Sequence, residues 1–107
     1  MPTNFLSDRI HRVAQYNYQW ATSATKHGVS KPRIRFVIEH CGLPYALPAE
    51  PPDRPSGRLL FLGDDQDGTA LEVMAIELMD DSLYVIHAME MQPRYNKPYK
   101  EAKPWRT

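Results

Sequence analysis

The sequence predicts an α+β fold, in which a small antiparallel β-sheet of three or four strands packs with two N-terminal helices and a C-terminal helix. Two segments with helical signals come first, three apolar runs joined by short turns follow, and a basic tail with a third helical pattern ends the chain. A length of 107 residues suits one modest core, so we expect residues 1–107 to form a single domain.

The first segment, residues 8–26, has two readings. Ser7 can cap a helix, and Asp8 is favourable in a first turn. In "AQYNYQW", however, Ala and aromatic residues alternate with Gln and Asn, which is the period of a strand. We expect a helix that Gly28 ends, with a first strand as the alternative.

The second helix has clearer signals. Ser30 is a good cap, Pro32 suits the first turn, and Gly42 can end the helix. The apolar residues between them have the spacing i, i+3, i+4, i+7: Ile34, Val37, Ile38 and Cys41. Residues 43–57 then carry five prolines, a density that predicts a Pro-rich loop with no regular element.

Three strands are predicted over residues 58–63, 70–78 and 82–89, and the turns "DDQDGT" and "MDD" join them into an antiparallel meander. In the middle strand Leu71, Val73 and Ala75 share one face, and Glu72, Met74 and Ile76 share the other. In the tail, Pro98 argues against a helix interior. A C-terminal helix could instead begin near Asn96, with Tyr95, Tyr99 and Ala102 docking on the sheet.

Composition predicts a cytoplasmic protein with no membrane segment. No apolar run approaches the roughly 18 residues of a membrane span, and the N-terminus lacks the pattern of a signal peptide. Charge is uneven along the chain. Residues 59–91 hold no Lys or Arg and 8 Asp or Glu, whereas the flanking segments are basic. The zero net charge argues against strong non-specific binding of nucleic acid.

Most familiar site chemistries are not indicated. The four histidines lack the spacing of a zinc motif, and the single cysteine, Cys41, lies on an apolar stripe as a small core residue would. No Gly-x-Ser-x-Gly sequence and no glycine-rich phosphate loop is present. We therefore predict no metal site and no cofactor.

The remaining candidates for chemistry are His27, His87, Arg94 and several tyrosines. Such groups can cleave RNA without a metal, because histidines exchange protons with the reacting oxygens and a guanidinium stabilises the charged transition state. Structural roles are the alternatives: helix-end stabilisation for His27, a strand-edge hydrogen bond for His87, and a solvated basic face for Arg94, Lys97 and Lys100. Residue types alone favour these structural roles.

Two short motifs resemble a known family. "KHGVS" at residues 26–30 precedes an amphipathic helix, and "IHAMEMQPRYNKPY" at residues 86–99 joins a last strand to a basic segment. In this order the motifs resemble the BrnT-type toxins of the RelE/ParE-like class of bacterial toxin–antitoxin proteins. The chain departs from that pattern at His87, where the family has Ser, at Met89, where it has Arg, and at Tyr95, where an acidic residue is common.

The resemblance implies the toxin of a type II toxin–antitoxin pair, acting as a metal-independent endoribonuclease on mRNA and bound by a cognate antitoxin protein. The expected catalytic residues are His87, Arg94 and His27, and the expected substrate-binding residues are Lys26, Lys97, Lys100, Tyr95 and Tyr99. The alternative is a catalytically silent relative that binds RNA or protein through Tyr16, Tyr18, Trp20 and the basic tail. A weaker alternative is a structural protein whose Pro-rich segment clasps another chain, and a homodimer stays open in each case.

Overall fold

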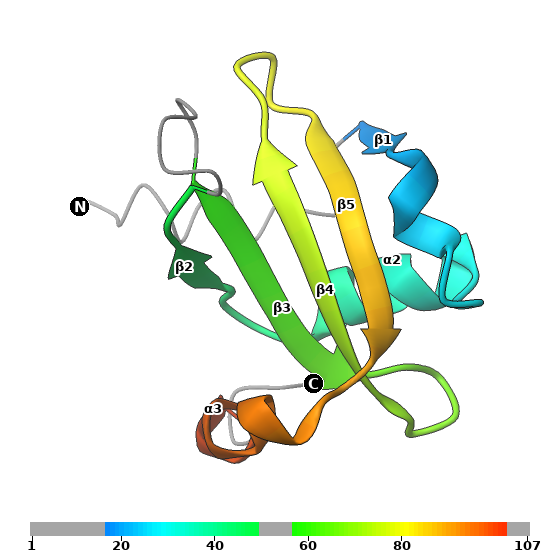
Figure 1. Ribbon diagram of the computed structural model, residues 1–107, viewed down its shortest axis with the longest axis vertical. Helices are drawn as coiled ribbons and strands as arrows, with labels where there is room; N and C mark the ends of the chain where they lie inside the picture. Colours follow the sequence, from blue (N-terminus) through cyan, green and yellow to red (C-terminus); the bar gives the residue numbers. More distant parts are fainter. Residues whose placement is uncertain (1–16, 50–56, 103–107) are drawn as a thin grey trace.

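The computed structural model describes residues 17–49 and 57–102 of the chain. Figure 1 shows a twisted sheet with α2 crossing behind it and α3 at one end. The elements in chain order are β1 (Tyr18–Trp20), the 3-10 helix η2 (Thr22–Thr25), α2 (Lys31–His40), β2 (Tyr45–Leu47), β3 (Arg58–Asp64), β4 (Ala70–Glu77), β5 (Leu83–Glu90), the 3-10 helix η3 (Pro93–Tyr95) and α3 (Asn96–Ala102).

The five strands form one mixed sheet in the order β1-β5-β4-β3-β2. The pairs β2–β3, β3–β4 and β4–β5 are antiparallel, whereas β1 is parallel to β5. The predicted fold class was wrong for the sheet and for the number of helices. The sheet has five strands and one parallel pair instead of three or four antiparallel strands, and the described residues hold one ten-residue α-helix and one short α-helix instead of three.

The helix expected over residues 8–26 is wrong in its described part, where β1 and η2 stand instead. Tyr18 and Trp20 pack against the main core from one side of β1. Backbone hydrogen bonds of 2.9 Å join the chain to β5 just before and just after β1. The period-two aromatic pattern therefore indicated the correct structure here, because it put both large rings on one face. Residues 8–16 lie outside the described residues.

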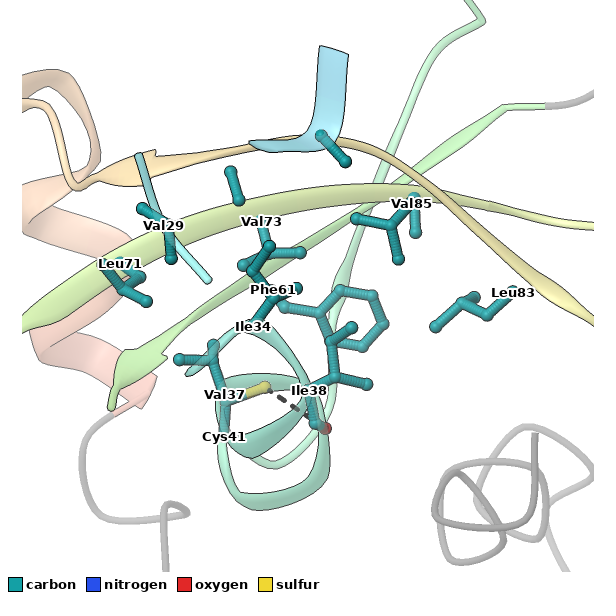
Figure 2. Packing of buried hydrophobic residues seen from close by; sticks show 13 residues of the cluster. Val29, Ile34, Val37, Ile38, Cys41, Phe61, Leu71, Val73, Leu83 and Val85 are labelled. Carbon is teal, nitrogen blue, oxygen red and sulfur yellow. Dashed lines mark hydrogen bonds between the residues drawn. The ribbon is translucent and has the colours of Figure 1, made fainter. Parts of the chain in front are cut away.

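Helix α2 matches the second helix expected from the sequence. It begins after Ser30, carries Pro32 in its first turn and ends at His40. Figure 2 shows its apolar stripe against the sheet: Ile34, Val37, Ile38 and Cys41 face Phe61, Val73 and Val85. Cys41 is buried in this cluster, as its position on the stripe predicted.

The prediction that residues 43–57 hold no regular element is wrong over Tyr45–Leu47, which form β2. These three residues contain no proline and stand between Pro44 and Pro48, so each keeps its backbone N–H for the pairing with β3. β2 is also the last strand at its edge of the sheet, where neighbouring prolines are tolerated. Residues 50–56 lie outside the described residues.

The meander β3–β4–β5 was predicted within one or two residues at each end. Its two faces differ as the alternation in β4 indicated. Leu71, Val73 and Ala75 lie in the cluster under α2, and Met74 lies in a second cluster on the opposite face. We call this opposite face of the sheet the second face.

The segment after β5 covers one end of the second face. Tyr95 of η3 and Tyr99 of α3 pack on it, as the sequence predicted. Helix α3 begins at Asn96, which leaves Pro98 in its first turn, where the missing N–H removes no helical hydrogen bond. Among the described residues, no helix has the length and apolar character that crossing a membrane would require.

Candidate functional site

A buried carboxylate lies at the centre of the second face. β4 places Glu72 between Leu62 of β3 and Met89 of β5, and its side chain is fully buried. Three donors meet it. The Gln92 backbone N–H donates to Oε1 at 2.9 Å, the Gln92 side-chain amide donates to Oε2 at 3.1 Å, and His87 Nε2 lies 2.9 Å from Oε2. These contacts supply the partners that a buried charge requires.

A register shift helps to position His87. The pairing of β4 with β5 slips between Met74 and Ala75, so that Ile86 is the extra residue and His87 stands opposite Met74. His87 therefore shares the second face with Glu72. An ionised carboxylate can only accept, so Nε2 of His87 is the donor in this contact and Nδ1 is left for another partner. With 23% of its side chain exposed, His87 can meet both Glu72 and a ligand from solvent.

His27 lies beside His87. The two ring centroids are 5.5 Å apart, with an edge-to-face angle of 75°. His27 is exposed in the turn after η2, where Gly28 adopts a φ of +83° that favours glycine. The Ser23 hydroxyl donates to the Ile86 carbonyl at 2.6 Å and holds η2 on β5. We call Glu72, His87 and His27 the histidine cluster.

The other predicted site residues are spread more widely. Lys26 precedes His27 and is exposed. Arg94 is exposed and lies over the Tyr95 ring, 5.0 Å from its centroid. Lys97 and Lys100 are exposed on α3. No described hydrogen bond or ring contact joins Arg94 to His87.

Tyr95 and Tyr99 have structural contacts. Both pack on the second face, and the Tyr99 hydroxyl donates to Asp64 Oδ1 at 2.6 Å. The structure thus brings together the two histidines that the sequence singled out. It places the basic residues of the tail on the neighbouring segment, which begins where Gln92 meets Glu72.

Sequence reasoning missed Glu72 and Gln92. A usable signal was present, because Glu72 is the one charged residue within the apolar run 70–76 and lies on the same face as Met74. A carboxylate in such a run must find a buried partner or face solvent. The sequence did not identify that partner, because His87 and Gln92 are distant along the chain.

The cluster has the residues for proton transfer. A carboxylate that holds one imidazole nitrogen orients the ring and stabilises its protonated form, while the second nitrogen can take a proton. His27 provides a second titratable ring at the same place. Within residues 17–49 and 57–102, no three His, Cys, Asp or Glu side chains converge as metal ligands would.

Comparisons of the chain with protein-family models, curated proteins and solved structures found no match.

Proposed function

We propose that this protein is a metal-independent endoribonuclease that cleaves mRNA as the toxin of a type II toxin–antitoxin pair. One observation carries the proposal: His87 is held by a buried carboxylate and stands edge-to-face with a second, exposed histidine. The motif resemblance supports the same class of activity. In this proposal Glu72 is a positioning residue, and His87 and His27 exchange protons with the substrate.

The chemistry needs no group beyond the RNA and these side chains. Nδ1 of His87 takes the proton from a ribose 2′-hydroxyl, and the 2′-oxygen attacks the adjacent phosphorus. The bond from phosphorus to the 5′-oxygen breaks, and protonated His27 gives its proton to that oxygen. The products are a 2′,3′-cyclic phosphate and a 5′-hydroxyl end. Glu72 stabilises the His87 imidazolium that forms.

Basic residues around the cluster would hold the phosphates. Lys26 lies next to His27 in the chain, and Arg94, Lys97 and Lys100 follow Gln92 on η3 and α3. An Arg guanidinium or a Lys ammonium near the scissile phosphate would stabilise the charge that develops on its oxygens. A cognate antitoxin protein would act by covering this surface.

The test is cleavage of a defined mRNA by the purified protein, with chelator present, together with growth after induced expression. Wild-type protein should cleave the RNA and arrest growth. His87→Ala and His27→Ala should each reduce the rate by about 10²–10⁴-fold, as the loss of a general acid or base does. His40→Gln is the matched control, because His40 lies on α2 and bonds the Phe36 carbonyl. Intact RNA with wild-type protein, or full activity in His87→Ala, would sink the proposal.

A binding module without catalysis is the second candidate. It is favoured by the stacked pair Tyr18 and Trp20, whose ring centroids lie 5.8 Å apart and which meet two cations of α2. Met89, in place of the family's Arg, points the same way. The two candidates separate in the cleavage experiment, since a binding module would retain RNA or a protein partner and leave the RNA intact.

A further inference from the structure

A groove at the β1 edge of the sheet lies apart from the histidine cluster. It is open to solvent and has a volume of about 650 Å³, within the range of about 300–1,000 Å³ that is usual for ligand sites. Its walls come from β1, α2 and the turn between β3 and β4: Asn17, Tyr18, Trp20, Lys31, Pro32, Arg35, Phe36, Glu39 and Gln66. We call it the aromatic groove.

Two stacked aromatic rings in this groove each meet one cation. Tyr18 and Trp20 stack with an interplanar angle of 23°. The Lys31 ammonium lies 5.3 Å from the Trp20 ring centroid, and the Arg35 guanidinium lies 5.0 Å from that of Tyr18. Both rings are half-buried, so part of each stays open to solvent.

Glu39 and Arg35 lie together at the Tyr18 end of the groove. The Tyr18 hydroxyl donates to Glu39 Oε2 at 3.2 Å, and Arg35 lies 3.5 Å from the same oxygen. Burial and the adjacent Glu39 carboxylate raise the pKa of Tyr18, so this phenol stays a neutral donor. Glu39 offsets one of the two cations, which leaves Lys31 as the excess positive charge beside Trp20.

We propose that the aromatic groove binds a nucleotide of single-stranded RNA, with its base on Trp20 and its phosphate on Lys31. The proposal deepens the proposed function and rests on it for its biological role, because it gives the nuclease a site for a nucleotide of the same strand away from the cleaved bond. A base has a π-face for stacking and polar edges that the amides of Asn17 and Gln66 can meet. Within the part of the chain that the structure describes, Lys31 forms no ion pair, and the backbone phosphate would provide one.

The position of the groove favours RNA over a peptide. Trp20 pairs with Val85 on β5, the strand that two residues later carries His87. The chain then runs from Trp20 through His27 to Lys31, so one segment supplies both the groove and the histidine cluster. Trp20 packs on the α2 side of the sheet and His87 lies on the second face, so a strand of RNA that meets both residues would pass around the β1 edge. Lys31 has a flexible four-carbon stem, so a base can displace its ammonium from the ring while the phosphate keeps it nearby.

The experiment measures Trp20 fluorescence in the full chain with Trp105→Phe, which leaves Trp20 as the only tryptophan. His87→Ala is added so that RNA stays uncleaved. An eight-nucleotide RNA should quench the emission and reach saturation, since a base stacks on the ring. The logarithm of the affinity should fall with the logarithm of salt concentration with a slope of about −0.7 for each phosphate contact, and Lys31→Gln should lower that slope by about 0.7.

Four controls decide the outcome. Arg58→Gln, on β3, should leave the quench unchanged, since Arg58 does not line the groove and carries the same charge as Lys31. Inorganic polyphosphate that quenches as strongly as the RNA would overturn the proposal, because the signal would then be charge alone. A mononucleotide that binds as tightly as the octamer would show that the groove does not require an RNA strand. A quench produced only by a peptide would show that the groove binds a protein partner instead.

The two proposals fail separately. If the wild type cleaves RNA but RNA does not quench Trp20, the RNA-binding role of the groove is refuted and the nuclease proposal stands. If RNA quenches Trp20 to saturation but the wild type does not cleave it, the groove binds RNA and the protein is a binding module without nuclease activity.

Discussion

The buried side chain of Glu72 accepts hydrogen bonds from both Gln92 and His87. Burial of a carboxylate in an apolar face costs free energy unless donors meet it, and here three donors do. Two of them come from Gln92, so the same carboxylate fixes the turn that leaves β5 and sets the orientation of His87. Glu72 therefore has a structural role and a proposed positioning role. A useful substitution at this residue must affect protein stability and RNA cleavage to different extents.

Glu72→Gln keeps the shape of the side chain but replaces one acceptor oxygen with a donor amide. We expect the free energy of unfolding to fall by roughly 1–3 kcal/mol, because a donor at Gln92 or His87 loses its acceptor. We expect RNA cleavage to fall further than this loss explains, because the amide can select the tautomer with its proton on Nδ1 of His87. Urea unfolding and cleavage rates measure the two effects.

The control for that substitution is Glu90→Gln, at an exposed position on β5. It should change neither quantity beyond about 0.5 kcal/mol, as surface substitutions usually do. Cleavage by Glu72→Gln at the wild-type rate would show that Glu72 only supports the fold.

Asp65 predicts a dependence of stability on pH. Burial alone would raise the pKa of Asp65, but the N–H groups of Thr69 and Asp67 and the Arg33 guanidinium outweigh it and lower the pKa below 3.8. A lowered pKa in the folded state means a stabilising contribution that is complete above about pH 3.8 and is lost as pH falls through the folded pKa.

The urea midpoint of Asp65→Asn should therefore depend less on pH between pH 6 and pH 2 than that of the wild type. The difference between the two proteins should be largest at pH 6 and should shrink in acid. Asp67→Asn is the control, since Asp67 contributes its backbone N–H and not its side chain to this turn. Parallel curves for the wild type and Asp65→Asn would refute the assignment.

At the scale of elements, two tyrosine hydroxyls attach α3 to the sheet. Tyr45 of β2 donates to the Pro98 carbonyl at 2.9 Å, and Tyr99 of α3 donates to Asp64 of β3 at 2.6 Å. A seven-residue helix is too short to be stable alone, so these bonds and the packing of Tyr95 and Tyr99 decide whether α3 stays in place.

Tyr45→Phe and Tyr99→Phe should each lower the free energy of unfolding by about 1 kcal/mol, the net contribution of one hydrogen bond. Hydrogen exchange should rise first in α3, because both bonds end on it or begin from it. Tyr95→Phe is the matched control, since its hydroxyl makes no hydrogen bond to a described residue. Equal stability for all three variants would mean that ring packing alone holds α3.

At the scale of the whole molecule, the core under α2 joins every described helix and strand except β2, η3 and α3. Its members come from η2, α2, β3, β4 and β5, with Tyr18 and Trp20 of β1 packed against it. Phe61 is the largest fully buried side chain and lies in the middle of this cluster. One cooperative unfolding transition is therefore expected.

Phe61→Ala should lower the free energy of unfolding by about 3–5 kcal/mol, from the lost burial and the cavity left behind. That is a large part of the 5–15 kcal/mol that a domain of this kind has in total. Far-ultraviolet circular dichroism and tryptophan fluorescence should follow one urea transition in the wild type. Transitions that do not coincide would show that the sheet and α2 unfold independently. Leu43→Ala, at an exposed residue, should change little.

Local sequence signals were sufficient for α2, for the meander β3–β5 and for the burial of Cys41. In each case a single period, a cap residue or a short turn fixes the structure from neighbours along the chain. The same signals were insufficient for β1 and β2. The period-two pattern offered β1 only as the alternative to a helix, and the prolines around β2 predicted a loop. Both strands have three residues each and depend on the hydrogen bonds that β5 and β3 offer them.

The sequence by itself determined the apolar faces of α2 and of the meander, and it singled out His27 and His87 as residues for chemistry. Only the tertiary structure decided that β1 joins β5 in parallel, that Glu72 holds His87, and that Trp20 and Lys31 line one groove. The physical reason is distance along the chain. Periodicity and capping act over a few residues, whereas these pairings join residues that only the closed sheet brings into contact.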